Sequence, residues 1–308
     1  MTIETNNKKE QENGLFPIRT VSAATGVNPI TLRAWERRYN LIVPKRTPKG
    51  HRLYTKDDIE NINRITSLLN QGIAISQVKP LLIEDQTPHT GSAGVISEDI
   101  WSKYKDMMLE AINNFDENRL DNIYNDALSL YPVDIISSRL INPLLQLLGE
   151  QWKDSETGIA EEHFFSVYLR NKLGSRIQHT SQRTTGPKLL IACLPGEQHE
   201  TGILLFSLAA LNHGYRTLIL GPNLPLDQIP AVLKKRSCDA IVLSGYSRPA
   251  KGLFQKQLPE LLNQVSVPVF IGGALAERYH DEIESINAIP AGSDIPTGLE
   301  TIAKALNA

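Results

Sequence analysis

The residues best suited to chemistry lie in one short stretch, Glu197-Gln198-His199-Glu200-Thr201-Gly202. A neutral imidazole such as that of His199 can ligate a metal. A carboxylate on its other ring nitrogen, here that of Glu197, would fix the tautomer and raise the basicity of the ring. Glu-x-His-x-x-Gly by itself is a weak signal, because three specified positions often occur by chance. Its meaning depends on the elements that hold it.

A second imidazole-carboxylate pair, Glu162-His163, follows Trp152 after nine intervening residues. If the pair stood alone, we would interpret it as solvated side chains beside a tryptophan at an interface. It gains meaning only through the motif at Glu197 and His199 further along the chain.

Positive charge is concentrated near the N-terminus of a chain whose formal net charge is −2. Between residues 31 and 56, eight lysines and arginines stand against one acidic residue, Glu36. Such a local excess suits a surface that faces nucleic-acid phosphates, although the whole chain is mildly acidic.

The motif at His199 lies where short apolar runs begin to alternate with helical stretches. The runs are Leu189–Leu194, Thr217–Leu220, Ala240–Ser244, Val267–Ile271 and a weak fifth at Ala288 and Ile289. This alternation predicts βαβ units and a doubly wound, flavodoxin-like parallel sheet over residues 187–308. Ligands of such sheets bind beyond the carboxyl ends of the strands, so the loops after Leu194, Leu220, Ser244 and Ile271 are the expected site.

The preceding segments predict a multidomain protein of α and α/β type. Residues 98–182 show repeated 3.6-residue apolar spacing, such as Trp101/Tyr104/Met108/Ile112 and Ile136/Leu140/Leu144/Leu148, which predicts a bundle of about four helices. Residues 84–97 lose this periodicity and contain proline and glycine, which indicates a linker. The polar residues 1–14 are interpreted as a disordered tail.

Residues 15–83 are predicted to form a helix-turn-helix with a basic wing. Asn28 is a suitable N-cap and Pro29 a suitable first residue for a helix that runs to about Tyr39. A turn and a short strand follow at residues 46–54. A further helix is expected to begin at Thr55, and its apolar stripe is Ile59, Ile62, Ile65 and Leu68.

This N-terminal region resembles the winged helix-turn-helix of MerR-family regulators. The resemblance rests on Asn-Pro-Ile-Thr-Leu-Arg-Ala-Trp-Glu-Arg-Arg-Tyr at residues 28–39 and Gly-His-Arg-Leu-Tyr at residues 50–54. It implies that double-stranded operator DNA is the partner, with Trp35 partly in the core. The residues expected to face bases or phosphates are Thr31, Arg33, Arg37, Arg38, Arg46, His51 and Arg52.

The C-terminal region resembles the cobalamin-binding Rossmann-like domain. The usual signature is Asp-x-His-x-x-Gly, a serine after the third strand and a Gly-Gly pair, and this chain departs from it by having Glu197 for the aspartate. The resemblance implies that His199 is the lower axial ligand of cobalt and that Glu197 is its partner. The other residues implied at this face are Gly202, Ser244, Gly272 and Gly273.

Trp152, Glu162 and His163 extend the resemblance to the CarH and LitR type of cobalamin-dependent photoreceptor regulators. It implies that the bundle caps adenosylcobalamin, with Trp152 on the adenosyl group, Glu162 bonded to its sugar and His163 supporting the pocket. Methylcobalamin or another cobalamin is the alternative. Lys153 stands where characterised members have a histidine. A charged ammonium cannot ligate cobalt, which argues against capture by a second histidine at this position after photolysis and leaves His163 or water as the alternative ligand.

The leading hypothesis is a cytoplasmic, non-enzymatic repressor that forms a dimer or tetramer with adenosylcobalamin and releases its operator in light. One alternative is a regulator that responds to cobalamin without light, or to no ligand. Another is a corrinoid carrier or enzyme component. No apolar run is long enough to cross a bilayer. Cys193 and Cys238 lie in or beside apolar runs, which predicts core cysteines in a reducing compartment.

Overall fold

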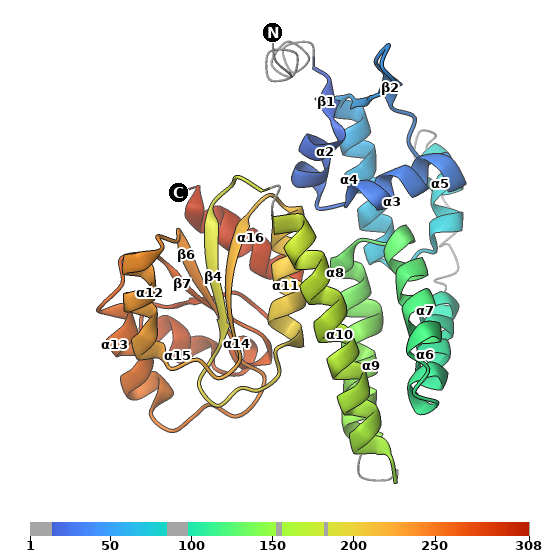
Figure 1. The fold of residues 1–308 in the computed structure, drawn as a ribbon. Helices are drawn as coiled ribbons and strands as arrows, with labels where there is room; N and C mark the ends of the chain where they lie inside the picture. Colours follow the sequence, from blue (N-terminus) through green and yellow to red (C-terminus); the bar gives the residue numbers. More distant parts are fainter. Residues whose placement is uncertain (1–13, 85–97, 152–155, 182–183, 308) are drawn as a thin grey trace. The chain divides into compact units, whose positions relative to one another are not determined.

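The computed structural model describes residues 14–84, 98–151, 156–181 and 184–307 (Figure 1). The chain divides into two compact units, residues 1–165 and 166–308. The division falls inside one long helix, α10 (Gly158–Ser181).

The N-terminal part of the first unit is a helix-turn-helix with a small antiparallel sheet. Its elements are β1 (Phe16–Pro17), α2 (Ile18–Thr25), α3 (Pro29–Ala34), the π-helical turn η1 (Trp35–Tyr39), β2 (Lys45–Arg46), β3 (Arg52–Tyr54), α4 (Lys56–Asn70) and α5 (Ile75–Glu84). Strand β3 lies between β1 and β2, and β2 with β3 forms the predicted wing.

Local chemistry explains where these helices begin. The Asn28 side chain accepts hydrogen bonds from the backbone N–H groups of Ile30 and Thr31, which caps α3. Thr55 and Asp58 form a reciprocal capping box at the start of α4, as predicted. One expectation is wrong. The buried residues of α4 are Ile62, Ile65 and Leu69, so Leu69 takes the core position predicted for Leu68.

The rest of the first unit and its continuation in α10 are helical. The elements are α6 (Glu98–Asn113), α7 (Glu117–Leu130), α8 (Val133–Ile136), the π-helical turn η2 (Ser137–Ile141), α9 (Asn142–Gln151) and α10. Helix α8, η2 and α9 follow one another without a break, which gives the predicted four helices. Both apolar series noted in the sequence are buried, which confirms the helical periodicity.

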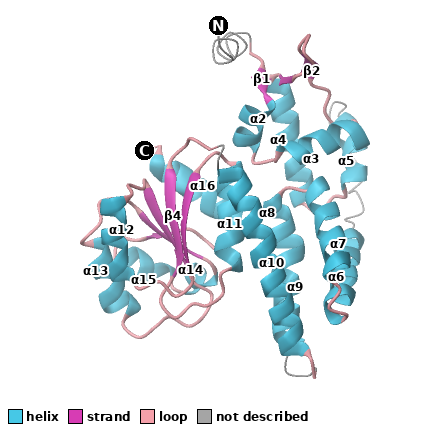
Figure 2. Ribbon diagram, in the orientation of Figure 1, coloured by secondary structure: helices cyan, strands magenta, loops and turns pink. Residues whose placement is uncertain are grey.

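The second unit contains a five-stranded parallel sheet flanked by helices (Figure 2). Its elements are β4 (Lys188–Cys193), α11 (Thr201–Asn212), β5 (Arg216–Gly221), η3 (Leu226–Gln228), α12 (Ile229–Lys235), β6 (Ala240–Ser244), η4 (Leu253–Gln257), α13 (Leu258–Leu262), β7 (Val269–Gly272), α14 (Ala274–Arg278), α15 (His280–Ser285), β8 (Ile289–Pro290) and α16 (Ile295–Leu306). The strand order β5-β4-β6-β7-β8 confirms the flavodoxin-like, doubly wound topology.

Alternate residues of the central strands pack into two hydrophobic cores, one on each face of the sheet. Leu190 and Ala192 of β4 share one core with residues of β6, β7, α12, α13, α14 and α15. Helices α11 and α16 cover the other side of the sheet (Figures 1 and 2). Because both faces are covered, the strands are nearly continuous apolar runs. Cys193 and Cys238 are buried and free, as predicted. None of the described helices is long and apolar enough to span a membrane.

Candidate functional site

The His199 motif lies in the loop between β4 and α11, at the carboxyl edge of the sheet, where the topology predicts ligand binding. The loop is fixed by its neighbours. The N–H of Leu194 donates to the carbonyl of Ser244, and the N–H of Gly196 donates to the side-chain oxygen of Asn223 over 2.7 Å. Hydrogen bonds within the protein thus link the loop after β4 to the loop after β5 and to the end of β6.

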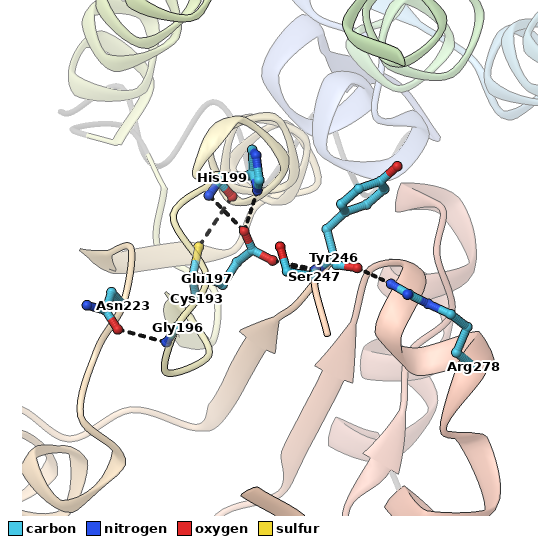
Figure 3. A network of polar contacts seen from close by, with 8 residues as sticks. All are labelled: Cys193, Gly196, Glu197, His199, Asn223, Tyr246, Ser247 and Arg278. Carbon is cyan, nitrogen blue, oxygen red and sulfur yellow. Dashed lines mark hydrogen bonds and ion pairs between the residues drawn. The ribbon is translucent and has the colours of Figure 1, made fainter. Parts of the chain in front are cut away.

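Glu197 is the polar centre of this edge (Figure 3). Its side chain is only 4% exposed, and its two carboxylate oxygens have different partners. One oxygen lies 2.5 Å from Nδ1 of His199 and accepts the His199 backbone N–H over 2.9 Å. The other accepts the backbone N–H groups of Tyr246 and Ser247 over 2.8 and 2.7 Å. One carboxylate therefore holds the histidine loop and the loop after β6 together.

These contacts determine the protonation of Glu197 and show which atom of the pair is the hydrogen-bond donor. Burial raises the pKa of Glu197, but the N–H groups of Ser247, His199 and Tyr246 and the imidazole outweigh it and lower the pKa to about 2. An ionised carboxylate only accepts hydrogen bonds, so Nδ1 of His199 must be the donor. Nε2 is then left with a lone pair when the ring is neutral. The His199 side chain is 63% exposed, which suits a ligand for a metal that is brought by a cofactor.

The glycines and serine around this edge lie where the sequence places them, with one difference. Gly202 is the second residue of α11 and has open space beside it. Ser244 and Gly272 end β6 and β7 and are register partners. A Cβ on Gly273 would lie 2.6 Å from the carbonyl oxygen of Gly245, so the close approach at Gly273 is made by the chain itself. Its role beside a nucleotide tail stays a prediction.

The residues expected above the cofactor belong to the end of the first unit. Trp152 and Lys153 lie outside the described residues. His163 is exposed on α10, and its Nδ1 donates to the carbonyl of Ile159 over 2.9 Å, which leaves Nε2 available. Glu162 is half-buried, with its carboxylate 3.9 Å from the His163 ring. The assignment of these residues to an upper face stays a prediction.

Sequence reasoning pointed to these loops but missed several residues that the structure brings together in them. Asn223, Tyr246 and Ser247 follow β5 and β6, in loops where chemistry was expected. Arg278 on α14 donates to the carbonyl of Tyr246. Tyr246 follows Ser244 by two residues, and this was the one signal that could have identified it.

The predicted DNA-binding residues of the recognition helix, α3 with η1, lie on two of its faces. Arg33, Arg37 and Arg38 are exposed. Thr31 is completely buried, and Trp35 is buried as well, further than the partial burial expected. Residues four apart share a helix face, so Thr31 and Trp35 form one stripe while Arg33 and Arg37 form another. The arginine stripe is exposed in this conformation, and the Thr31 stripe is buried.

The buried stripe of the recognition helix caps another helix. The last carbonyls of α7 have no partners within their own helix. The Thr31 hydroxyl donates to the carbonyl of Leu128 over 3.2 Å, and the Trp35 indole N–H donates to that of Leu130 over 2.7 Å. The expectation that Thr31 faces DNA therefore fails for this conformation, because a tertiary contact has taken its hydroxyl. For Thr31 to reach DNA, the recognition helix must leave α7.

This docking predicts that weakening the α3–α7 contact strengthens DNA binding. Asp126 of α7 lies 3.9 Å from Arg38 and accepts a hydrogen bond from the Tyr104 hydroxyl. Asp126→Arg replaces attraction by repulsion beside the recognition helix, so we expect the affinity for a selected DNA duplex to rise about fivefold. Electrophoretic mobility shift titrations measure this change.

Two controls separate docking from other effects of Asp126→Arg. Glu117→Arg makes the same charge change at the far end of α7, and Tyr104→Phe removes the hydrogen bond without adding charge. An equal gain in Glu117→Arg would show that added positive charge, rather than undocking, raises the affinity.

The wing is joined to the recognition helix by Glu36. Its carboxylate accepts a hydrogen bond from Arg46 over 2.8 Å and a shorter one from Arg52, which is only 19% exposed. His51 at the tip of the wing is exposed. Two of the basic residues assigned to DNA therefore also set the position of the wing. Burial raises the pKa of Glu36, but the two arginines outweigh it and hold this pKa below its usual value.

Glu36→Gln is expected to destabilise the N-terminal region by about 1 kcal/mol at neutral pH, because it removes two charge-assisted hydrogen bonds. A lowered folded-state pKa gives stability that is present above the unfolded pKa and is lost as the pH falls through the folded one. Urea unfolding should therefore show a difference from wild type that shrinks in acid. Glu60→Gln, at an exposed position of α4, is the control; a difference for Glu36→Gln that persists at low pH would contradict the ionic explanation.

Two domain families match this chain. Residues 16–84 match the MerR HTH family of regulatory proteins, and residues 104–176 match the B12-binding domain. The chain therefore combines a MerR-type HTH region with a B12-binding domain.

Relatives with the same organisation extend over most of the chain. The HTH-type transcriptional repressor CarH of Myxococcus xanthus is 28% identical over 279 residues, which cover 88% of this chain and 93% of the relative. The repressor CarA of the same organism is 26% identical over 274 residues, covering 88% and 91%. The likeness thus includes the DNA-binding region as well as the regions that follow it.

A solved structure resembles the helical and sheet regions. The monomethylamine corrinoid protein of Methanosarcina barkeri aligns with a TM-score of 0.52 at 20% identity, over 67% of this chain and 98% of that protein. At this identity the likeness shows the fold alone, a helical region followed by a Rossmann-like sheet.

Proposed function

We propose that this protein is a cytoplasmic transcriptional repressor that senses light through bound adenosylcobalamin, and that ligand-dependent oligomerisation controls its binding to double-stranded operator DNA. One observation supports this most strongly. A buried, ionised Glu197 holds Nδ1 of an exposed His199 and leaves Nε2 available at the carboxyl edge of a parallel sheet. The same chain carries a MerR-type DNA-binding region at residues 16–84, called the head below, and a B12-binding domain at residues 104–176.

The residues present suit a cobalamin. His199 would ligate cobalt through Nε2, and Glu197 would keep the ring in the required tautomer. Gly202 leaves open space at the first turn of α11. The bound cofactor supplies a cobalt–carbon bond that light can cleave. His199 would supply the protein's ligand to cobalt and Glu197 would orient it, and Trp152, Glu162 and His163 are assigned to the opposite face of the cofactor.

Regulation requires that ligand, assembly and DNA affinity be coupled between two states of the protein. The docked recognition helix supplies one such state, in which Thr31 is occupied by α7. In a second state, with the recognition helix released from α7, the Thr31 stripe would become available to DNA in addition to the arginine stripe. We assign the cofactor-bound dimer or tetramer to DNA binding and the illuminated protein to release.

The test uses the full chain mixed with adenosylcobalamin in the dark and then exposed to green light. Absorption spectra, size-exclusion chromatography and binding to a duplex selected by the dark protein are measured in parallel. We expect a bound-cofactor spectrum, assembly and DNA binding in the dark, and a change in all three after illumination. His199→Ala should lose the cofactor signal, whereas His280→Ala, at an exposed position of α15, should not. Binding without any response to light would leave a light-independent cobalamin regulator, and absence of binding would contradict the proposal.

A further inference from the structure

A large aliphatic side chain is exposed at the start of the recognition helix. Ile30 is the second residue of α3, and 54% of it is exposed. In the part of the head that the structure describes, the other large apolar residue left exposed is Val43, in the loop between η1 and β2. Ile30 is therefore not part of the core of the head, although its residue type would suit one.

Ile30 lies at the N-terminal end of the arginine stripe. Residues three or four positions apart share a helix face, so Ile30, Arg33 and Arg37 follow one another along it. The Arg37 side chain donates to the backbone carbonyl of Arg33 over 3.3 Å, which keeps it on this face. All three side chains are exposed, whereas Thr31 and Trp35 on the other stripe are buried. One exposed face of the helix thus combines an apolar side chain with two cations.

The Ile30 side chain is held in a defined position by its own turn of helix. Its backbone N–H donates to the side-chain oxygen of Asn28 over 2.9 Å, which caps α3. Pro29, just before it, restricts the backbone of the same turn. A β-branched side chain has one strongly preferred χ1 rotamer in a helix. Ile30 therefore loses little conformational entropy when another apolar group covers it.

The position of Ile30 in the helix determines which part of a DNA duplex it can reach. The N-terminal residues of a recognition helix contact base edges in the major groove. The apolar group on those edges is the methyl group of thymine, and the other groups are hydrogen-bond donors and acceptors. Arginines bind phosphates or guanine, so Arg33 and Arg37 are not suited to detect this methyl group. The chemistry of Ile30 matches it.

We propose that Ile30 is a specificity-determining residue that packs against the methyl group of a thymine in the operator. This inference rests on the proposed function, since it assumes that the recognition helix enters the major groove of operator DNA. The two arginines of the stripe supply positive charge, and Ile30 supplies discrimination at one base pair.

The test uses full chains with adenosylcobalamin in the dark and a duplex that wild type selects from random sequences. Each thymine of this duplex is replaced in turn by deoxyuridine, which lacks only the methyl group. Fluorescence anisotropy titrations give the affinities of wild type and Ile30→Ala. We expect deoxyuridine at one position of the site to weaken wild type about fivefold, because a buried methyl contact is lost. Ile30→Ala should lose a similar factor on the unmodified duplex and nothing more with deoxyuridine at that position.

Three further measurements separate this contact from other effects of Ile30→Ala. The slope of log affinity against log salt should equal that of wild type, since no charge is removed. The thermal unfolding midpoint should also be unchanged, because the side chain is exposed and only the backbone of Ile30 takes part in the cap. Val43→Ala removes apolar surface from the head outside the recognition helix, and it should respond to deoxyuridine as wild type does.

Each other outcome overturns the assignment in a recognisable way. If no deoxyuridine weakens wild type, Ile30 contacts no thymine methyl group, while DNA binding by the head stands. If deoxyuridine weakens wild type and Ile30→Ala alike, another residue contacts the methyl group. An equal loss of affinity in Val43→Ala, or a lower unfolding midpoint of Ile30→Ala, would mean that general apolar surface or folding explains the effect. If wild type selects no duplex, the proposed function and this inference fail together.

Discussion

Replacement of Glu197 by alanine is expected to destabilise the sheet unit by about 3 kcal/mol, because three backbone N–H groups lose their acceptor at once. The groups are those of His199, Tyr246 and Ser247, and they belong to two loops that the carboxylate joins. The loss should also free the His199 ring to rotate, so cobalamin binding should fall with stability. Urea unfolding of the full chain, with hydrogen exchange in peptides from β4 and β6, measures the effect.

Glu200→Ala is the matched control for Glu197→Ala, since both remove a carboxylate from the same loop. Glu200 pairs with Arg170, whose side chain is 59% exposed, and such a pair contributes about 0.5 kcal/mol. Similar destabilisation in the two variants would contradict the view that the buried carboxylate of Glu197 organises this edge.

The sheet could be predicted from the sequence because its physical signals are local. Parallel strands that are buried on both faces are short apolar runs, and the loops after them follow from the topology. The observed strand β6 has the predicted bounds, and β4 differs from its prediction by one residue at each end. The Glu197–His199 pair was found because a carboxylate and an imidazole two residues apart in one loop are within reach of each other.

The features that could not be predicted depend on contacts between segments that are distant in the sequence. Nothing near Thr31 in the sequence indicates that its hydroxyl caps a helix 97 residues further along the chain. Glu36 was read as the one acid in a basic region, whereas folding brings Arg46 and Arg52 to it. Tyr246 is joined to the site through a carboxylate 49 residues away. Tertiary hydrogen bonds of this kind have no periodicity, so sequence pattern cannot predict them.

A second helix end, that of α4, is also capped by a contact between the head and the helical bundle. Arg139 of η2 donates to the carbonyl of Asn70, the last residue of α4. The bundle region therefore caps a helix of the head, while Thr31 and Trp35 of the head cap α7. Helix ends need such partners, and water or another protein group can supply them. For the proposed switch we therefore expect the docked and released states to differ by little free energy.

Arg33→Ala is expected to have the largest effect on DNA binding among single changes in the head. Arg33 is exposed on the stripe of the recognition helix that α7 leaves open, so it can contact DNA in the docked and the released states. Loss of an arginine at a base or phosphate should cost about 1–3 kcal/mol in affinity for a duplex selected by wild type. Fluorescence anisotropy titrations over a range of salt concentrations measure this loss.

The salt dependence of binding distinguishes how Arg33 acts. If Arg33 neutralises one phosphate, the slope of log affinity against log salt falls by about 0.9, and the affinity for unrelated duplexes falls in parallel. If it reads a base, the slope changes little and discrimination between duplexes is lost. Lys235→Ala removes the same charge from an exposed position in the sheet unit and should leave DNA binding unchanged. Equal losses in the two variants would mean that net charge, and not the recognition helix, governs the affinity, and the assignment of α3 to DNA would then be wrong.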